Sequence, residues 1–205
     1  MDSVFNAFVK QSPITVMARG MMERVLNPER LDELFDQTAE VQYTRNLLFS
    51  SVFNIMSRVV CGHHRSVNDS FLASKEEIGV SITSVYNKLQ GIETRTSAEL
   101  VRYASKEIQT IIEKLGGGQK PLISGFRVKL LDGNCIAATE HRLKELRSIA
   151  AGALPGKSLV VYDPSLRIPI DVFPCEDGHA QERSLLHEVL PSVEKGDLWI
   201  ADRNF

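Results

Sequence analysis

The chain has 205 residues, an apolar fraction of 43% and a formal net charge of −2. These values are typical of folded globular proteins and exclude the disordered and fibrous classes. A chain of this length can bury one good core or two small ones. Its three cysteines, Cys61, Cys135 and Cys175, are odd in number and lack paired metal-ligand spacing, so we expect free thiols and a cytoplasmic location.

Neither a secretion signal nor a membrane span is expected. The N-terminus lacks a basic segment followed by an apolar one. The apolar run 47–61 is interrupted by serines, Asn54 and Arg58, which favours a buried helix. Residues 88–147 carry eleven Lys/Arg against seven Asp/Glu, whereas residues 171–205 carry three against eight. A pI near 6.2 argues mildly against a nucleic-acid partner, but the acidic C-terminal segment suits a cation-binding site.

The first 116 residues have the periodicity of helices. Asn27 followed by Pro28 is typical of a capped helix N-terminus. The runs 44–60 and 97–115 place apolar residues on one helical face. The segment 61–64 (Cys-Gly-His-His) suggests a metal site, but one cysteine and two adjacent histidines lack chelating spacing, so a polar helix end is favoured.

A helix-turn-helix is predicted between residues 72 and 89. One helix ends at Gly79, and Ser81 caps the next helix, which packs through Val85 and Leu89. Lys75 occupies a position where a small residue is usual, so a plain helical hairpin is the alternative. In the DNA-binding interpretation, the second helix offers four polar side chains to a DNA groove: Thr83, Ser84, Asn87 and Lys88.

The glycine-rich run 116–121 predicts a domain boundary. No Lys-Ser/Thr pair follows it at the spacing of a phosphate-binding loop, so a linker is favoured. We expect a helical N-terminal domain over residues 1–118 and a second domain over residues 119–205. The pattern in the second domain predicts a strand at 128–131, a charged helix at 139–147, a loop at 151–157, a hairpin of strands 159–163 and 168–173, a helix at 181–190 and a closing strand at 198–201.

Two of these predicted strands are directly followed by an aspartate. Asp132 follows the first strand and precedes a glycine, and Asp202 follows the closing strand. Two such carboxylates are the minimum for a two-metal phosphodiester site. An aspartate that merely ends a strand in a turn is the alternative for each. Trp199, in the middle of the closing strand, is expected in the core.

Four segments of the second domain resemble the catalytic core of bacterial insertion-sequence transposases of the insertion-sequence-four type, in the ribonuclease-H-like superfamily of DDE transposases and integrases. The segments are 131–134 with 139–143, 154–164, 175–183 and 197–205. The resemblance implies an α+β fold, with a helical N-terminal region followed by a partial ribonuclease-H-like core of order strand, strand, strand, helix, strand. Over residues 1–118 the resemblance is looser.

The resemblance further implies cut-and-paste DNA transposition through metal-dependent phosphodiester hydrolysis and strand transfer. Asp132 and Asp202 would be the catalytic residues and would hold Mg²⁺ or Mn²⁺. Arg142 and Arg203 would contact DNA phosphates, with an ordinary surface charge as the alternative for Arg142. The implied partners are the DNA of the transposon ends and further copies of the protein, in a homo-oligomer or with full-length transposase, and no membrane.

One element of the family pattern is missing. The family's third carboxylate is a glutamate in a Tyr–Arg–Glu–Lys signature beyond the second aspartate, and this sequence ends three residues after Asp202. Glu176 and Glu182 precede Asp202 and therefore do not replace it. We expect a truncated transposase that is inactive alone. The alternatives are a non-catalytic DNA-binding or oligomerising module that inhibits transposition, and an unrelated helical regulator whose aspartates finish turns.

Overall fold

The computed structural model describes residues 3–42, 46–141, 154–175, 180–203 and 205. Its contacts divide the chain into two compact units, Met1–Leu100 and Val101–Phe205, each with its own hydrophobic core. The division falls inside helix α8 (Thr94–Lys114), upstream of the glycine-rich run where the sequence predicts a boundary. Among the described residues, no helix is long and apolar enough to cross a membrane.

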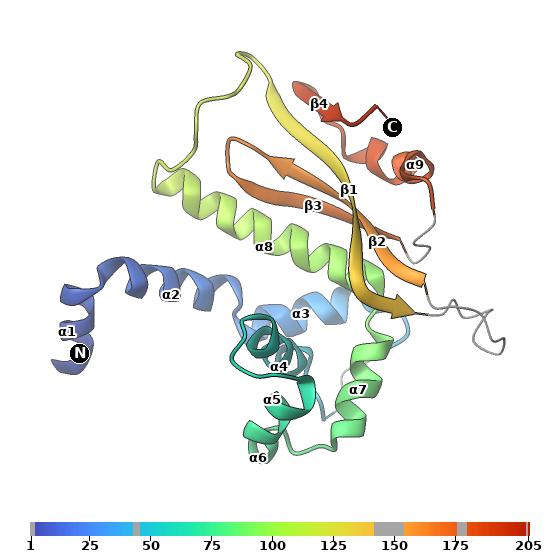
Figure 1. The fold of residues 1–205 in the computed structure, drawn as a ribbon. Helices are drawn as coiled ribbons and strands as arrows, with labels where there is room; N and C mark the ends of the chain where they lie inside the picture. The colour runs from blue at the N-terminus through green and yellow to red at the C-terminus, as the bar shows by residue number, and fades with distance from the viewer. Residues whose placement is uncertain (1–2, 43–45, 142–153, 176–179, 204) are drawn as a thin grey trace. The chain divides into compact units, whose positions relative to one another are not determined.

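Unit 1 is helical (Figure 1). Its elements are α1 (Ser3–Gln11), α2 (Pro13–Val25), α3 (Pro28–Thr38), α4 (Phe49–Val60), α5 (Val67–Ala73), α6 (Lys75–Ile78), α7 (Ile82–Gly91) and the start of α8. The predicted caps are confirmed, because the Asn27 side chain accepts a hydrogen bond from the Arg30 N–H (3.1 Å) and the Ser81 hydroxyl accepts one from the Ser84 N–H (3.2 Å). These bonds satisfy N–H groups that have no partner inside the helix.

The core of unit 1 is built from apolar residues at helical spacing. Helix α4 contributes Val52 and Ile55, which lie three residues apart on one face, and α7 contributes Val85, which is fully buried. Phe71 from α5 and Leu47, which precedes α4, belong to the same cluster. Burial of this kind supplies most of the stability of short helices, since helices of this length are marginal alone.

Unit 2 is a mixed four-stranded sheet flanked by helices. The strands are β1 (Arg127–His141), β2 (Leu154–Asp163), β3 (Ile168–Cys175) and β4 (Asp197–Ala201), and the short helices η2 (Glu182–Leu185), α9 (Leu186–Val189) and η3 (Leu190–Ser192) lie between β3 and β4 in the chain. The spatial order is β3-β2-β1-β4. Strands β1, β2 and β3 are antiparallel neighbours, and β4 runs parallel to β1. The predicted α+β class and the order strand, strand, strand, helix, strand are confirmed.

One face of the sheet carries the core of unit 2. Leu131, Leu159, Val161 and Phe173 pack with residues of the β3–β4 connection. The second half of α8 is hydrogen-bonded to the outer strand β3: the Ser105 hydroxyl donates a hydrogen bond to the Pro169 carbonyl (2.7 Å). Pro169 therefore lies near the start of an edge strand, a position that tolerates its missing N–H.

Three local predictions in unit 2 are wrong. Strand β1 does not end at Asp132 but continues to His141, so residues 139–141 are strand and not helix. Residues 154–157 belong to β2 and not to a loop. The physical reason is pairing across the sheet: Cys135 lies opposite Lys157 and Ile136 opposite Gly156. Such long-range pairing overrides the local turn preference of an Asp-Gly pair. The remainder of the predicted helix, residues 142–147, lies outside the described residues.

Candidate functional site

Asp132 on β1 and Asp202, the residue directly after β4, follow the last pair of the two parallel strands. The pairing ends with Leu131 opposite Ala201, and each aspartate is the next residue in the chain after one member of that pair. Adjacent strands in a sheet are about 4.8 Å apart, and paired residues of in-register strands face the same side. Both aspartates are exposed. The register of β1 and β4 therefore predicts neighbouring backbone positions for these two aspartates, which are seventy residues apart in the chain.

The two carboxylates suit a hard cation. Mg²⁺ is commonly held by one or two carboxylates, with water and substrate phosphate oxygens completing its coordination. Asp132 and Asp202 supply oxygen ligands of this type, and their exposure leaves room for water and for a phosphate group. Within the described part of the chain, however, no three His, Cys, Asp or Glu side chains gather so that they could hold a metal ion. The residues therefore fit a weakly held, hydrated ion.

At Gly133, the residue after Asp132, the glutamate of η2, Glu182, lies directly over the backbone of β1. A Cβ atom on Gly133 would overlap the Glu182 carboxylate, and the Glu182 Cγ would lie at only 2.9 Å. The Lys157 ammonium of β2 fixes this side chain from the other side, at 3.4 Å from the Glu182 carboxylate, and also donates to the Ala180 carbonyl (3.0 Å). Sequence reasoning missed this cluster, although the glycine after Asp132 was a signal that something passes close to the strand.

The other residues predicted in this region differ in their exposure and contacts. Arg203 is exposed in the turn that follows β4, directly after Asp202. Arg142 lies outside the described residues. Trp199 is half-buried and packs against the core of unit 2, as expected, and its indole N–H points to Asp197 (3.4 Å). Asp197 also accepts a hydrogen bond from the Lys129 ammonium at 2.6 Å, and both side chains are buried.

In unit 1, the segment expected to form a helix-turn-helix has the geometry of two helices joined by a tight turn. Helix α6 ends at Gly79, which adopts the left-handed conformation (φ 66°) that favours glycine. Two residues later Ser81 caps α7, and Val85 anchors α7 in the core. The preceding helix is interrupted at Ser74, between α5 and α6.

The four polar residues predicted to read DNA do not share one surface. Thr83 and Asn87 are exposed, but Ser84 is half-buried and its backbone N–H is used by the cap of α7. Lys88 is buried at 8% exposure, with its ammonium 4.2 Å from the centre of the Phe35 ring. Burial lowers the pKa of Lys88, and the nearby acid Asp32 only partly opposes this. The prediction that Lys88 contacts DNA is therefore corrected: its position on α7 faces the core.

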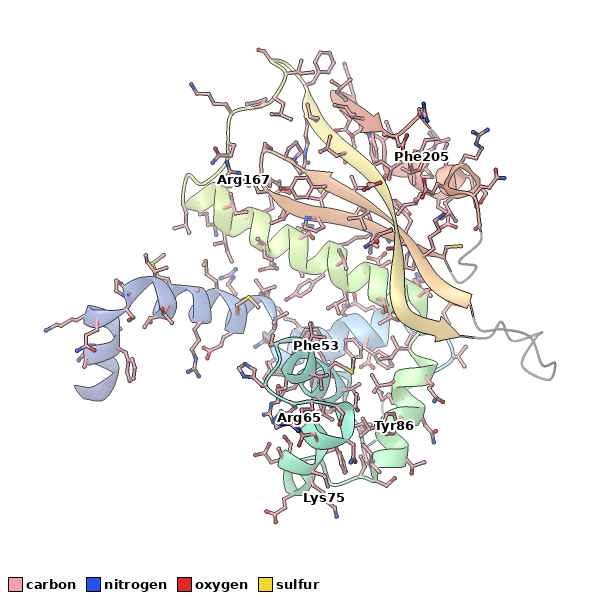
Figure 2. All side chains as sticks on the ribbon, viewed as in Figure 1. Phe53, Arg65, Lys75, Tyr86, Arg167 and Phe205 are labelled. Carbon is pink, nitrogen blue, oxygen red and sulfur yellow. The ribbon has the colours of Figure 1, made fainter. Side chains whose placement is uncertain are left out.

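Two residues of α7 that the sequence reasoning left out lie on its exposed face. Tyr86 is 40% exposed (Figure 2) and Gln90 is exposed. Together with Thr83 and Asn87 they have the spacing of one helical face. The signal in the sequence was the position of Val85: once Val85 points inward, residues 83, 86, 87 and 90 must point outward. This face can donate and accept hydrogen bonds and offers one aromatic ring.

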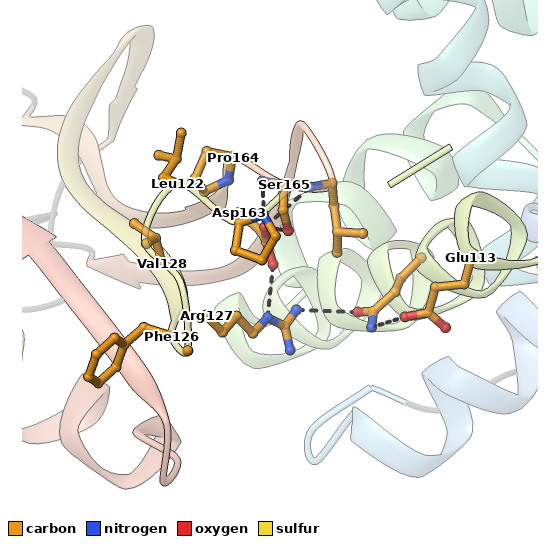
Figure 3. A pocket seen from close by; sticks show the side chains of 12 residues that line it. Glu113, Leu122, Phe126, Arg127, Val128, Asp163, Pro164 and Ser165 are labelled. Atoms are coloured by element: carbon orange, nitrogen blue, oxygen red, sulfur yellow. Dashed lines mark hydrogen bonds and ion pairs between the residues drawn. The ribbon is translucent and has the colours of Figure 1, made fainter. Parts of the chain in front are cut away.

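The buried polar network of unit 2 connects the β2–β3 turn to β1 and α8 (Figure 3). The Asp163 carboxylate accepts hydrogen bonds from Arg127 Nε (2.8 Å), from the Ser165 hydroxyl (2.6 Å) and from two backbone N–H groups of the turn. Burial raises the pKa of Asp163, but these hydrogen bonds outweigh it and hold the pKa below its usual value. The network lines a pocket of about 470 Å³, and its charges are paired within the protein.

Comparison with known proteins identifies no similar protein. No family model, no curated protein and no solved structure matches the chain.

Proposed function

We propose that the chain belongs to a DNA transposase that uses Asp132 and Asp202 as its metal-binding catalytic residues. The observation that carries this proposal is that the two aspartates directly follow Leu131 and Ala201, the last residue pair of the adjacent parallel strands β1 and β4. The chain order of three strands, helices and a fourth strand supports it, since this is the order implied by the resemblance to ribonuclease-H-like transposases. A cytoplasmic location, where the DNA substrate lies in bacteria, is part of the same proposal.

In this proposal the protein positions charge around a phosphodiester of the transposon end. Bound Mg²⁺ or Mn²⁺ would lower the pKa of the attacking hydroxyl or water and stabilise the leaving oxygen. Asp132 and Asp202 would hold the ion, and the pairing of β1 with β4 directly before them would keep the two residues at neighbouring positions. Arg203, exposed next to Asp202, would bind a neighbouring phosphate oxygen.

DNA recognition is assigned in this proposal to the exposed face of α7. Thr83 and Asn87 offer hydrogen-bonding groups at the start and middle of the helix, and Tyr86 adds a ring that can contact sugar or base edges. Because no basic residue of α7 is exposed, phosphate binding must come from other parts of the protein.

Titration with Mn²⁺ tests the metal site. Isothermal titration calorimetry should show binding to the wild type that is lost in the double variant Asp132→Asn, Asp202→Asn. The matched control is Asp171→Asn, since Asp171 lies on the far strand β3 and is paired with Arg102 (2.6 Å). Identical traces for the wild type and the double variant would contradict the proposal, whereas a control that binds Mn²⁺ like the wild type supports it.

The second candidate is a non-catalytic DNA-binding module that competes with an active transposase. It is favoured by the complete exposed face of α7 together with the absence, within the described residues, of a third side chain beside Asp132 and Asp202 to complete a metal site. A DNA-nicking assay in Mg²⁺ and a gel-shift assay on the same transposon-end duplex separate the candidates. Nicking that disappears in the double aspartate variant supports the enzyme. Sequence-specific binding without nicking supports the module.

A further inference from the structure

A cavity of about 250 Å³ in unit 2 has the features of a small binding site. Its lining comes from the second half of α8, from all four strands and from the segment around Ser192 and Glu194. All of these residues belong to unit 2, and Asp132 and Asp202 are not among them. Pockets for drug-sized ligands measure roughly 300–1,000 Å³, so this cavity suits a smaller ligand.

Basic side chains dominate the polar part of this lining. Within the described residues they are Arg102, Lys106, Arg127 and Lys129. Three of them form ion pairs with carboxylates of unit 2, at nitrogen–oxygen distances of 2.6–2.8 Å. Lys106 is exposed and pairs with no carboxylate in the part of the chain that the structure describes. The fold thus neutralises three of these charges and leaves that of Lys106 available to a ligand.

Lys129 has hydrogen-bond donors that the protein does not use. An ammonium group carries three N–H donors. The Lys129 side chain is 7% exposed, and its one hydrogen-bond partner among the described residues is Asp197. Its ammonium lies 5.3 Å from the centre of the Trp199 ring, which also lines the cavity. Buried donors are normally satisfied, so the remaining N–H groups indicate an acceptor inside the cavity.

Arg127 offers a further donor at the same wall. A guanidinium group carries five N–H donors. The Arg127 Nε donates to Asp163, and one terminal nitrogen donates to Gln109 (3.4 Å), as the dashed lines in Figure 3 show. The other terminal nitrogen has no hydrogen-bond partner among the residues that the structure describes. The charge of Arg127 is therefore paired, but its capacity to donate is not exhausted.

The unused donors lack an acceptor of the protein's own. The Ser105 and Ser192 hydroxyls donate to backbone carbonyls (2.7 Å each), and Asp171 accepts from an arginine (2.6 Å). A phosphate group has several acceptor oxygens around one centre and forms charge-assisted hydrogen bonds with lysine and arginine. A carboxylate has only two oxygens, in one plane, and so satisfies donors that come from both α8 and β1 less completely.

We propose that this cavity binds a phosphate group, held by Lys129 and Arg127 on β1 and by Lys106 on α8. The phosphate is either the free inorganic ion or the terminal group of a small phosphomonoester, since both present the same oxygens. Glu194, an exposed carboxylate of the lining, weakens the attraction through its negative charge. This assignment does not depend on the proposed catalytic or DNA-binding function.

The indole of Trp199 is a direct probe of the cavity, because Trp199 is the one tryptophan of the chain. Its N–H points to Asp197 (3.4 Å), the partner of Lys129, and so responds to a ligand at that ammonium. Titration of the full chain with inorganic phosphate at constant ionic strength should shift the indole resonance in proton–nitrogen NMR spectra until it saturates. Chloride at the same ionic strength is the control and should cause no saturable shift.

A parallel titration with adenosine monophosphate distinguishes the two sources of the phosphate group. Tighter binding of the nucleotide than of inorganic phosphate identifies a phosphomonoester as the ligand. Tighter binding of inorganic phosphate identifies the free ion. A Trp199 resonance that shows no saturable shift with either compound overturns the proposal, since the cavity then holds only water.

Three exposed residues test the location of the site without disturbing the core. Lys106→Gln should weaken phosphate binding about fivefold, because it removes an exposed attracting charge, and Glu194→Gln should tighten binding by a similar factor. Lys114→Gln is the matched control: it removes the same charge from the same helix outside the cavity, and it should bind phosphate like the wild type. A Lys106→Gln variant that binds phosphate as tightly as the wild type overturns the proposal. Weakened binding in that variant, with Lys114→Gln unchanged, supports it.

Discussion

Lys88 illustrates how strongly a single residue's environment decides its role. Its side chain crosses the ring of Phe35 inside unit 1, and burial lowers its pKa, so its charge is a cost of folding and not a contact for DNA. The aliphatic part of the side chain packs like an apolar residue. Asn87, the preceding residue, is exposed and free of such constraints on its side chain.

This contrast predicts different outcomes for neighbouring substitutions on α7. Lys88→Met should keep or raise the melting temperature and leave DNA affinity unchanged, because methionine fills the same space without a buried charge. Asn87→Ala should leave stability unchanged and weaken binding of a transposon-end duplex by about 1–3 kcal/mol. Fluorescence anisotropy and thermal melting of both variants are the measurements. Equal losses of affinity in the two variants would show that α7 does not use its exposed face.

The close approach of the Glu182 side chain to Gly133 leads to a second prediction for a single residue. Gly133→Ala should destabilise the protein by about 1 kcal/mol, because the new methyl group would displace the Glu182 carboxylate from its place near Lys157. In a Glu182→Ala background the same substitution should cost less, since the obstructing side chain is gone. Urea unfolding of the two single variants and the double variant measures this coupling. Additive effects would mean that Glu182 does not lie over β1.

At the scale of elements, the β2–β3 turn depends on one buried carboxylate. Asp163 ties the turn residues Ser165 and Leu166 to β1 through Arg127, and the same turn holds Arg167 in the left-handed conformation (φ 60°). A non-glycine residue in that conformation is unfavourable, so the surrounding hydrogen bonds must stabilise it. The turn therefore joins β2 to β3 at a fixed register.

The lowered pKa of Asp163 predicts how stability depends on pH. Because its pKa in the folded state lies below the unfolded value of about 3.9, its stabilising contribution is complete above that pH and is lost as the pH falls through the folded-state pKa. Asp163→Asn should destabilise the protein by about 2 kcal/mol at neutral pH and should reduce the loss of stability on acidification. Urea unfolding at neutral and acidic pH measures both effects. An unchanged acid dependence would contradict the assignment.

The elements that the sequence predicted correctly are those determined by local chemistry. The Asn27 and Ser81 caps, the hairpin between β2 and β3, and the closing strand before Asp202 each follow from residues close in the chain. The continuation of β1 beyond Asp132 was not predictable in this way, because its pairing partners lie on β2, from thirteen residues away (His141 with Leu154) to twenty-six residues away (Gly133 with Leu159). The neighbouring positions of Asp132 and Asp202 could only be hypothesised from the sequence, because they depend on the long-range pairing of β4 with β1.

The same distinction explains the residues missed or misassigned at the candidate sites. Whether Lys88 or Tyr86 faces outward depends on the rotation of α7, which Val85 determines through its contacts with other helices. The position of Glu182 over Gly133 depends on the path of the chain between β3 and β4. Neither is encoded in a local motif.

At the scale of the whole molecule, the two units have separate cores. Phe35 is buried in unit 1 and Leu159 in unit 2, and each belongs to contacts within its own unit. Separate cores commonly unfold as separate cooperative transitions. We expect differential scanning calorimetry to resolve two transitions.

Two core substitutions identify these transitions. Phe35→Ala should lower the midpoint of one transition and Leu159→Ala that of the other, each by a loss of about 3–4 kcal/mol in its own unit. The control is to compare each variant with the wild type at both midpoints. If either substitution lowered both midpoints equally, the chain would unfold as a single cooperative body.

The two borders of the sheet differ in a way that limits how it can be extended. Strand β3 forms one border, and its eight residues include Pro169 and Pro174, neither of which has an N–H group to offer. Strand β4 forms the other border, and none of its five residues is a proline. An incoming strand, from this chain or from another molecule, would therefore meet two prolines alongside β3 and none alongside β4, the strand that Asp202 follows.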